Sequence, residues 1–417
     1  MENRILLLLL LFYIFSFLFE SIIDVFNYRH SIKNKPLPVI SDVYSFWPYR
    51  KHLLYTKANA YYNFLRSGVT AIITIIVIWG GVLTYLDAKI ATFAGVNLIY
   101  RSVLFFGVLW LLELIVSTPF SYFHTFTIEE RFGFNKTTKK LFWVDLLKST
   151  LLSLILGGII LFVVSWLFYT YPNNFWIPIL ILLIVISFIS SVLYTRVILP
   201  LFNKKSPLPD GELKSLLYEL SEKAGFPVNS IYVIDSSKRS TKANAFFTGF
   251  GRTKRIYLYD TLINNLNPVE IAAVLAHEIG HYKKKHTWIN LLLSILVTGV
   301  YLFVFNYLCQ INLFDKAFGV TLSQPSLHFN LIGFVLLTIP IQFILSPITS
   351  FISRKMEYAA DGYAVKLELG ESLIAGLKKL ASLNFQNLNP LPLYVWINYS
   401  HPPLASRVGS ILQSIKN

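Results

Sequence analysis

The sequence predicts a mainly α-helical protein that crosses a membrane seven times and carries a smaller α+β portion outside it. Three observations support this fold class. Hydrophobic residues make up 54% of the 417 positions and charged residues only 14%, a composition unlike that of soluble globular proteins. The apolar residues fall in runs of about 20, the length of a helix that crosses a bilayer. The basic residues are concentrated in alternate loops, as in multi-pass membrane proteins.

Seven apolar runs are candidate spans, with approximate bounds 5–26, 69–86, 102–123, 147–169, 176–199, 288–308 and 331–351. No small-residue cleavage site follows the first run, so we expect an uncleaved span rather than a signal peptide. We expect four parts: residues 1–200 hold spans one to five with cytoplasmic loops, 201–287 the first part of a cytoplasmic domain, 288–351 spans six and seven, and 352–417 the second part of that domain.

The formal charge of +15 is explained by topology. Most Lys and Arg lie in the loops after spans one, three and five and in the C-terminal tail, whereas the opposite loops hold Lys89, Arg101 and Lys316. The positive-inside rule therefore predicts an outside or lumenal N-terminus and a cytoplasmic C-terminus. We expect contact with membrane lipids and no nucleic-acid partner.

The two polar segments, 201–287 and 352–417, are separated by only two spans, so they can meet on one membrane face. Within the first, residues 212–223 predict an amphipathic helix, and residues 231–234 and 255–259 predict strands. We expect a small antiparallel sheet with a glycine-containing turn at 249–251. The single cysteine, Cys309, excludes an intrachain disulfide and a thiolate zinc site.

The segment Asn267-Pro-Val-Glu-Ile-Ala-Ala-Val-Leu-Ala-His-Glu-Ile-Gly-His281 predicts a capped, buried helix. His277 and His281 lie one turn apart on the same face, so both imidazoles can bind one metal ion. Glu278 lies beside them, where a glutamate can contact a metal-bound water without being a ligand. The alternative is a pair of surface histidines with an incidental glutamate, which a buried helix disfavours because an unpaired buried carboxylate is costly.

A hydrolytic zinc site needs a third protein ligand and an open fourth position. His286 would lie on the far side of an unbroken helix, so we expect it to be solvated among the neighbouring lysines. Glu357 is the better candidate, because Glu357 and Asp361 share a helical face and would repel without a cation. Asp361 would then hydrogen-bond a zinc-bound histidine. The alternative is a solvated acidic face paired with Arg354 or Lys355.

These motifs, in their positions relative to the spans, resemble the type I CAAX prenyl endopeptidases. Further similar stretches are Glu129-Glu-Arg-Phe-Gly-Phe-Asn-Lys136, Pro200-Leu-Phe-Asn-Lys204, Pro207-Leu-Pro-Asp-Gly211, Asn244-Ala-Phe-Phe-Thr-Gly249, Lys254-Arg-Ile-Tyr-Leu-Tyr-Asp-Thr261 and Ser400-His-Pro-Pro403 with Arg407. The resemblance covers nearly the whole chain and includes every expected metal and catalytic position.

The resemblance implies a chambered barrel of seven transmembrane helices, capped by a cytoplasmic zinc metalloprotease domain with one Zn²⁺ per chain. It implies that Asn244, Ala245 and Phe246 form an edge strand that binds substrate, that His401 donates to the oxyanion, and that Arg407 supports the acidic residues around the metal. Taken without the family, His401 before two prolines is equally compatible with a structural turn histidine, and Asn244 is better explained as a turn residue.

The predicted function is a zinc endopeptidase in which Glu278 activates the attacking water. The resemblance implies a lipidated peptide or protein substrate and release of the C-terminal tripeptide of prenylated CAAX sequences. Two alternatives stay open: a quality-control protease for membrane proteins without prenyl specificity, and a transporter or scaffold with a structural zinc site. The sequence leaves open an ER membrane in a eukaryote and a plasma or inner membrane in a bacterium.

Overall fold

Long helices dominate the computed structural model, which describes residues 2–44, 46–95, 97–226, 228–248, 254–320 and 324–417. Six described helices are long and apolar enough to cross a membrane, and the bent pair α7 and α8 adds a seventh crossing if it counts as one span. The six are α1 (Glu2–Lys33), α2 (Phe46–Trp79), α4 (Leu98–Phe123), α6 (Lys139–Thr170), α12 (His286–Gln310) and α14 (Leu327–Lys366). The bent pair is α7 (Trp176–Leu193) and α8 (Leu199–Phe202), joined by the π-helical turn Tyr194–Ile198.

The second span only partly overlaps the predicted run at 69–86. The apolar run at 69–86 is broken at Gly80 and Gly81, where Gly81 adopts a φ of 71°, so α2 ends at Trp79 and the short helix α3 (Val82–Ala94) follows. A left-handed φ favours glycine, which has no Cβ to clash with the backbone. The crossing helix therefore begins near residue 46 and includes the polar stretch that we expected to be a loop.

The third span continues further than its apolar run. After α4, the π-helical segment His124–Glu129 leads into α5 (Glu130–Phe132), which ends at Gly133 with a φ of 85°. This extension places the side chains of Tyr55 and Glu129 within 2.5 Å of each other. Lys242, from the first polar segment, contacts Glu129 at 2.9 Å. The loop after the third span is thereby attached to the polar domain.

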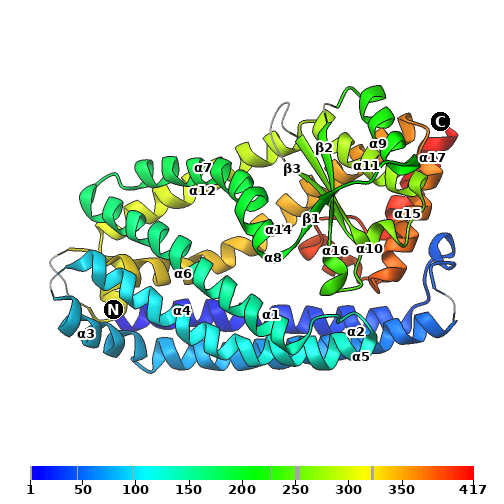
Figure 1. The fold of residues 1–417 in the computed structure, drawn as a ribbon. Coiled ribbons are helices and arrows are strands. Elements are labelled where there is room, and N and C mark those ends of the chain that lie inside the picture. The colour runs from blue at the N-terminus through cyan, green and yellow to red at the C-terminus, as the bar shows by residue number, and fades with distance from the viewer. Residues whose placement is uncertain (1, 45, 96, 227, 249–253, 321–323) are drawn as a thin grey trace.

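The helices form two groups around α14. Figure 1 shows α1, α2, α4 and α6 extended along one side of the molecule and the α7–α12 pair on the other, with the sheet at one end and α3 at the opposite end. The helix α14 packs against α1, α4 and α12 in its membrane part and against α11 beyond it. One helix thus connects the spans to the polar domain.

A buried ion pair closes the end of the molecule that lies away from the sheet. The guanidinium of Arg101, at the start of α4, contacts both oxygens of Asp87 on α3. His328, at the start of α14, lies 3.1 Å from Asp87 and 3.2 Å from the hydroxyl of Ser102. Asp87 and His328 are almost fully buried, so this cluster adds a charged contact to the apolar packing that joins the three helices.

The polar domain contains a four-stranded sheet in the order β1-β2-β4-β3. Its strands are β1 (Lys205–Pro207), β2 (Val228–Ile234), β3 (Ala245–Thr248) and β4 (Lys254–Tyr259). The two strands expected from the sequence are present, but β2 and β4 pair in parallel, and only the pairs β1–β2 and β3–β4 are antiparallel. The expected antiparallel sheet is therefore wrong for its central pair. The predicted turn at 249–251 lies outside the described residues.

The helices of the polar domain come from both polar segments. The predicted helix at 212–223 is confirmed as α9 (Glu212–Lys223). The others are α10 (Asp260–Ile263), α11 (Pro268–Lys283), α15 (Gly370–Leu383), α16 (Pro392–Asn398) and α17 (Leu404–Lys416), and α13 (Leu313–Ala317) follows α12 outside this domain. One apolar core contains residues of α9, α11, α15, α17 and the sheet, so residues 201–287 and 352–417 fold together, as their separation by two spans allows.

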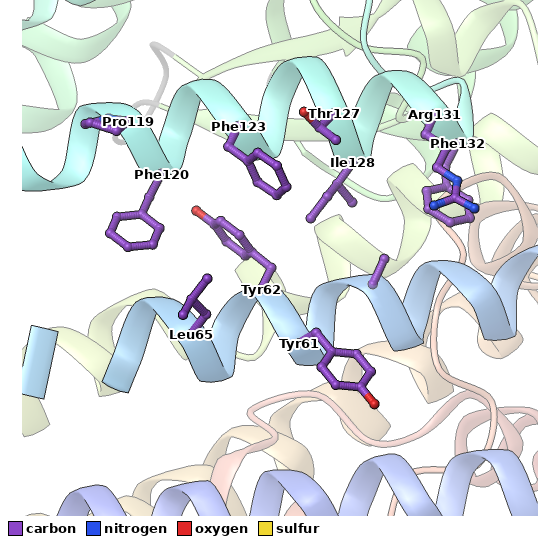
Figure 2. Close-up of a pocket in the computed structure, with 11 residues that line it drawn as sticks. Tyr61, Tyr62, Leu65, Pro119, Phe120, Phe123, Thr127, Ile128, Arg131 and Phe132 are labelled. Atoms are coloured by element: carbon purple, nitrogen blue, oxygen red, sulfur yellow. The ribbon is translucent and has the colours of Figure 1, made fainter. Parts of the chain in front are cut away.

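An aromatic cavity of about 460 Å³ lies between α2 and the α4–α5 segment. Figure 2 shows Tyr62 and Leu65 of α2 opposite Phe120, Phe123 and Ile128. Arg131 and Phe132 lie at one end of the row. Its lining is almost entirely apolar, with one guanidinium.

Candidate metal centre

The helix α11 holds two histidines and a glutamate in one turn because its start is fixed. Asn267 accepts a hydrogen bond from the Glu270 amide at 2.8 Å, and the Glu270 carboxylate accepts one from the Asn267 amide at 2.9 Å. This reciprocal pair is the expected capping box. Lys379 of α15 lies 2.7 Å from the carboxylate of Glu270, which balances its buried charge.

Small residues let a second helix approach α11. Ala273, Ala276 and Gly280 are buried, and a Cβ added at Gly280 would lie 2.9 Å from the Cα of Ala360 on α14. The two backbones are therefore nearly in contact at the level of the histidines. This approach brings Glu357, on the extension of α14 beyond its membrane part, beside them.

His277, His281 and Glu357 form a compact cluster of potential metal ligands. Their candidate ligand atoms lie within 4.8 Å of one another. The Nε2 of His281 is 3.2 Å from Glu357 Oε1 and 3.2 Å from the Nε2 of His277, which is 3.5 Å from Glu357 Oε2. The structure thus brings together the three residues that the sequence selected as ligands.

The donor set fits a divalent cation. The Nδ1 of His277 contacts Asp361 Oδ1 at 2.8 Å, so a neutral His277 has its proton there and a lone pair on Nε2. That lone pair, the His281 Nε2 and the carboxylate of Glu357 then converge. Among the described residues, the buried Glu357 Oε2 has no hydrogen-bond partner. Three electron-rich groups that face one another in a buried site require a positive charge between them, and two imidazoles with one carboxylate are typical zinc ligands.

Asp361 and Arg407 form a second layer around the cluster. Arg407, on α17, donates from Nε to Asp361 Oδ2 at 2.9 Å and from a terminal nitrogen to Oδ1 at 2.6 Å. A two-point guanidinium–carboxylate contact of this kind holds both side chains in a fixed orientation. A further nitrogen of Arg407 lies 3.7 Å from Glu357 Oε2. Arg407 therefore offsets part of the charge of both carboxylates.

The solvated acidic face that we considered as an alternative is contradicted by burial. Glu357 is 4% exposed and Asp361 1%. Arg354 instead donates to the backbone carbonyls of Val395 and Tyr399 at 3.0 and 2.6 Å, where it supports the end of α16. These contacts fix the segment that leads to His401.

Glu278 lies at the wall of the same cavity as the histidines. Burial raises the pKa of Glu278 above the ordinary value for glutamate, and the Glu357 charge raises it further, while His277, His281 and Arg407 act in the opposite direction. A carboxylate with a raised pKa is a better proton acceptor near neutral pH. His401 reaches the cluster from the other side, with its Nε2 3.4 Å from Glu357 Oε1, and its side chain is 65% exposed.

A cavity of about 570 Å³ surrounds this cluster. On one wall is the edge strand β3 with the residues before it, and Ala243, Asn244, Ala245 and Phe247 contribute to the lining. Phe246, which we expected to bind substrate, is not among the lining residues and stacks on Tyr257 with ring centroids 5.2 Å apart. Alternation along a strand places neighbouring side chains on opposite faces, so Phe247 rather than Phe246 faces the cavity.

Several lining residues carry no motif that sequence reasoning would select. The apolar wall includes Leu373, Leu377 and Leu380 of α15, whose spacing places them on one helical face and could have indicated it. Asn384 and Gln386 also contribute. Asn384 accepts from the Ala243 amide at 3.2 Å, so it holds the start of the edge strand, a role no sequence pattern marks.

The prediction for His286 is wrong. The chain does not continue as one helix past Lys283: Lys285 adopts a left-handed φ of 57°, and His286 begins α12. Its imidazole is 6% exposed rather than solvated, and its Nδ1 lies 3.0 Å from His281 Nδ1. His286 therefore belongs to the site, next to one of the candidate ligands.

A buried, helix-borne pair of histidines with two carboxylates beside them, in a chain with six long apolar helices, is the arrangement of a membrane metallopeptidase. Comparison with known proteins agrees: residues 27–204 match the family model described as "CAAX prenyl protease N-terminal, five membrane helices", and residues 207–415 match peptidase family M48. The chain belongs to this family of CAAX prenyl protease-like M48 peptidases.

Curated relatives extend along most of the chain. CAAX prenyl protease 1 of Saccharomyces cerevisiae is 35% identical over 96% of this chain and 93% of its own length. The CAAX prenyl protease 1 homolog of Homo sapiens is 31% identical over 81% of this chain and 80% of its own length. The crystal structure of S. mikatae Ste24p superposes with a TM-score of 0.91 at 34% identity and covers 98% of each chain.

Proposed function

We propose that this protein is a zinc-dependent endopeptidase that removes the C-terminal tripeptide of prenylated CAAX proteins or peptides. The observation that supports the metal-dependent chemistry is the convergence of His277, His281 and Glu357 within 4.8 Å, with Glu278 beside them in the same cavity. The substrate class is inferred from the relatives, which are CAAX prenyl protease 1 of Saccharomyces cerevisiae and its human homolog.

His277, His281 and Glu357 would hold one Zn²⁺ per chain and leave a fourth position open for water or substrate. The ion would supply a water of lowered pKa and a polarised substrate carbonyl. Glu278 accepts the proton of the attacking water and returns it to the leaving amine, the double role of a general base that becomes a general acid. His401 donates to the oxygen on which negative charge develops, a contribution of roughly 3 kcal/mol for a well-placed donor.

The edge strand β3 gives the substrate backbone a place to bind. Among the described residues β3 pairs with β4 alone in the sheet, so the backbone groups along its other edge can receive an extended peptide. The Ala245 amide at this edge donates to Asn244 Oδ1 at 2.8 Å. Asn244 and Ala245 line the cavity at this edge. A peptide added there would have its backbone held beside Glu278, which lines the same cavity.

The membrane part supports a lipidated substrate. The aromatic cavity between α2 and α4–α5, of about 460 Å³, is the kind of surface that an isoprenoid tail would occupy. We also propose that the spans enclose a chamber that opens to the metal centre, and that this centre faces the cytoplasm, since the basic residues follow the positive-inside pattern. The host membrane would be the ER in a eukaryote or the plasma membrane in a bacterium.

The test compares the purified full-length protein with Glu278→Gln on matched prenylated and non-prenylated CAAX peptides. We expect Glu278→Gln to bind one equivalent of zinc while its turnover falls by about 10²–10⁴-fold, the usual contribution of a general base. Undiminished turnover would refute the role of Glu278. Equal cleavage of both peptides by the unmodified protein would favour the alternative, a quality-control protease without prenyl specificity. Zinc binding without any cleavage would favour a scaffold or transporter.

A further inference from the structure

His286 has no assigned role, yet the backbone brings it to the metal centre. The helix α11 ends at Lys283, where the Lys284 amide still bonds to the Gly280 carbonyl at 3.0 Å. The left-handed residue Lys285 then interrupts the helix, and His286 starts α12. On an uninterrupted helix this side chain would point away from His281. The break places the two imidazoles 5.0 Å apart between ring centroids, at an interplanar angle of 73°.

The two rings meet through one specific pair of atoms. The Nδ1 of His286 lies 3.0 Å from the Nδ1 of His281. The other ring nitrogen of His281, Nε2, is the one that faces Glu357 and His277, at 3.2 Å from each. A neutral imidazole has one N–H and one lone pair. If His281 uses its Nε2 lone pair for a metal, its proton is on Nδ1 and points at His286.

His286 is not itself positioned as a ligand. Its Nδ1 is directed to His281, and the compact group of potential ligand atoms among the described residues consists of His277, His281 and Glu357 alone. Its near-complete burial leaves little solvent to compete for the contact. His286 therefore contacts the Nδ1 of His281, as Asp361 contacts the Nδ1 of His277. In both histidines this is the ring nitrogen that faces away from the proposed metal position.

We propose that His286 is a positioning residue of the metal centre: it accepts a hydrogen bond from His281 Nδ1–H and so fixes the tautomer and ring orientation that leave Nε2 free to bind the ion. This inference rests on the proposed metal site. Partners of metal-binding histidines usually change metal affinity by about 10–100-fold when removed, and the same loss is expected here although the acceptor is neutral.

The experiment measures zinc affinity of the full-length protein by competition with a chromophoric chelator, with no peptide substrate present. His286→Leu removes the acceptor, and we expect its Kd for zinc to rise about 10–100-fold. His286→Gln retains an acceptor oxygen, and we expect a Kd closer to that of the unmodified protein than to that of His286→Leu. His52→Leu is the control, because His52 is an equally buried histidine that packs on Tyr44 outside the metal cluster. It should bind zinc normally.

An unchanged Kd for His286→Leu would overturn the proposal. So would equal weakening in the Leu and Gln variants, since that result would assign His286 a space-filling role only. Thermal unfolding of the metal-free forms reports whether each variant folds. If His286→Leu does not fold, His286→Phe keeps a ring without an acceptor and must show the same loss of zinc affinity. Because no peptide is cleaved, failure here is separate from failure of the proposed protease function.

Discussion

The closest backbone approach in the site predicts a large effect from adding a single methyl group. In Gly280→Ala, the new Cβ would lie 2.9 Å from the Cα of Ala360, 3.0 Å from its carbonyl oxygen and 3.0 Å from the Cβ of Tyr363. Carbon atoms pack best at about 3.5–4.0 Å, so the contact is about 0.6 Å too short. Two of the three neighbours are backbone atoms of α14, which cannot move aside as a side-chain tip can.

The helices α11 and α14 must therefore separate, and they carry the three candidate ligands. His277 and His281 lie on α11 and Glu357 on α14, so a displacement of about half an ångström acts on the metal geometry. Zinc sites tolerate ligand distances within about 0.2 Å of the ideal. We expect zinc affinity to fall by at least about tenfold, or roughly 1.4 kcal/mol. Two opposite effects act on the free energy of unfolding of Gly280→Ala. Overpacking lowers it by about 1–3 kcal/mol, and replacing a helical glycine by alanine raises it by about 1 kcal/mol.

Gly362→Ala provides the matched control on α14. No atom lies within 4 Å of a Cβ added at Gly362, so this variant gains the helix propensity without the clash. We expect it to bind zinc normally and to be slightly more stable. Chelator competition gives the zinc Kd, and thermal unfolding of the metal-free proteins gives the stability. Normal zinc binding and raised stability in Gly280→Ala would refute the close-approach argument.

Three further outcomes follow from contacts in the structure. Asp361→Asn keeps the shape of the side chain but removes the charge between His277 and Arg407, so zinc affinity measured by chelator competition should fall about 10–100-fold. An unchanged affinity would contradict the role of Asp361. Arg101→Met leaves Asp87 buried without its guanidinium partner and should lower the free energy of unfolding by about 3–5 kcal/mol, measured by denaturation. A decrease below about 1 kcal/mol, the range of exposed ion pairs, would mean that the pair is solvated. Asn267→Ala removes the cap of α11 and should cost about 1 kcal/mol, with zinc stoichiometry unchanged; full stability would show that the cap is dispensable.

The parts of the site that were predictable from sequence follow regular helix geometry. His277, Glu278 and His281 occupy consecutive positions of one helix, and a helical turn determines their relative directions. Glu357 and Asp361 could be selected because two like charges on one helical face need a cation. The structure brings these residues into one cluster. In each case the inference required only local regularity and charge.

The parts that were missed depend on departures from that regularity. His286 was placed wrongly because one left-handed residue, Lys285, ends the helix, and a lysine carries no signal for such a backbone state. The second span was misplaced because its helix includes the polar stretch near residue 50 and ends at Trp79, just before the left-handed Gly81. The parallel pairing of β2 and β4 depends on where the intervening chain crosses, which strand propensity does not encode.

The helix α14 has a consequence for how the protein is made. It runs without interruption from the membrane part to Glu357, while the two histidines precede α12 in the chain. During synthesis the imidazoles emerge first, and their carboxylate arrives only after two more hydrophobic helices have been inserted. Completion of the candidate metal site is therefore a late step of biogenesis, because it requires α12 and α14 to be in place.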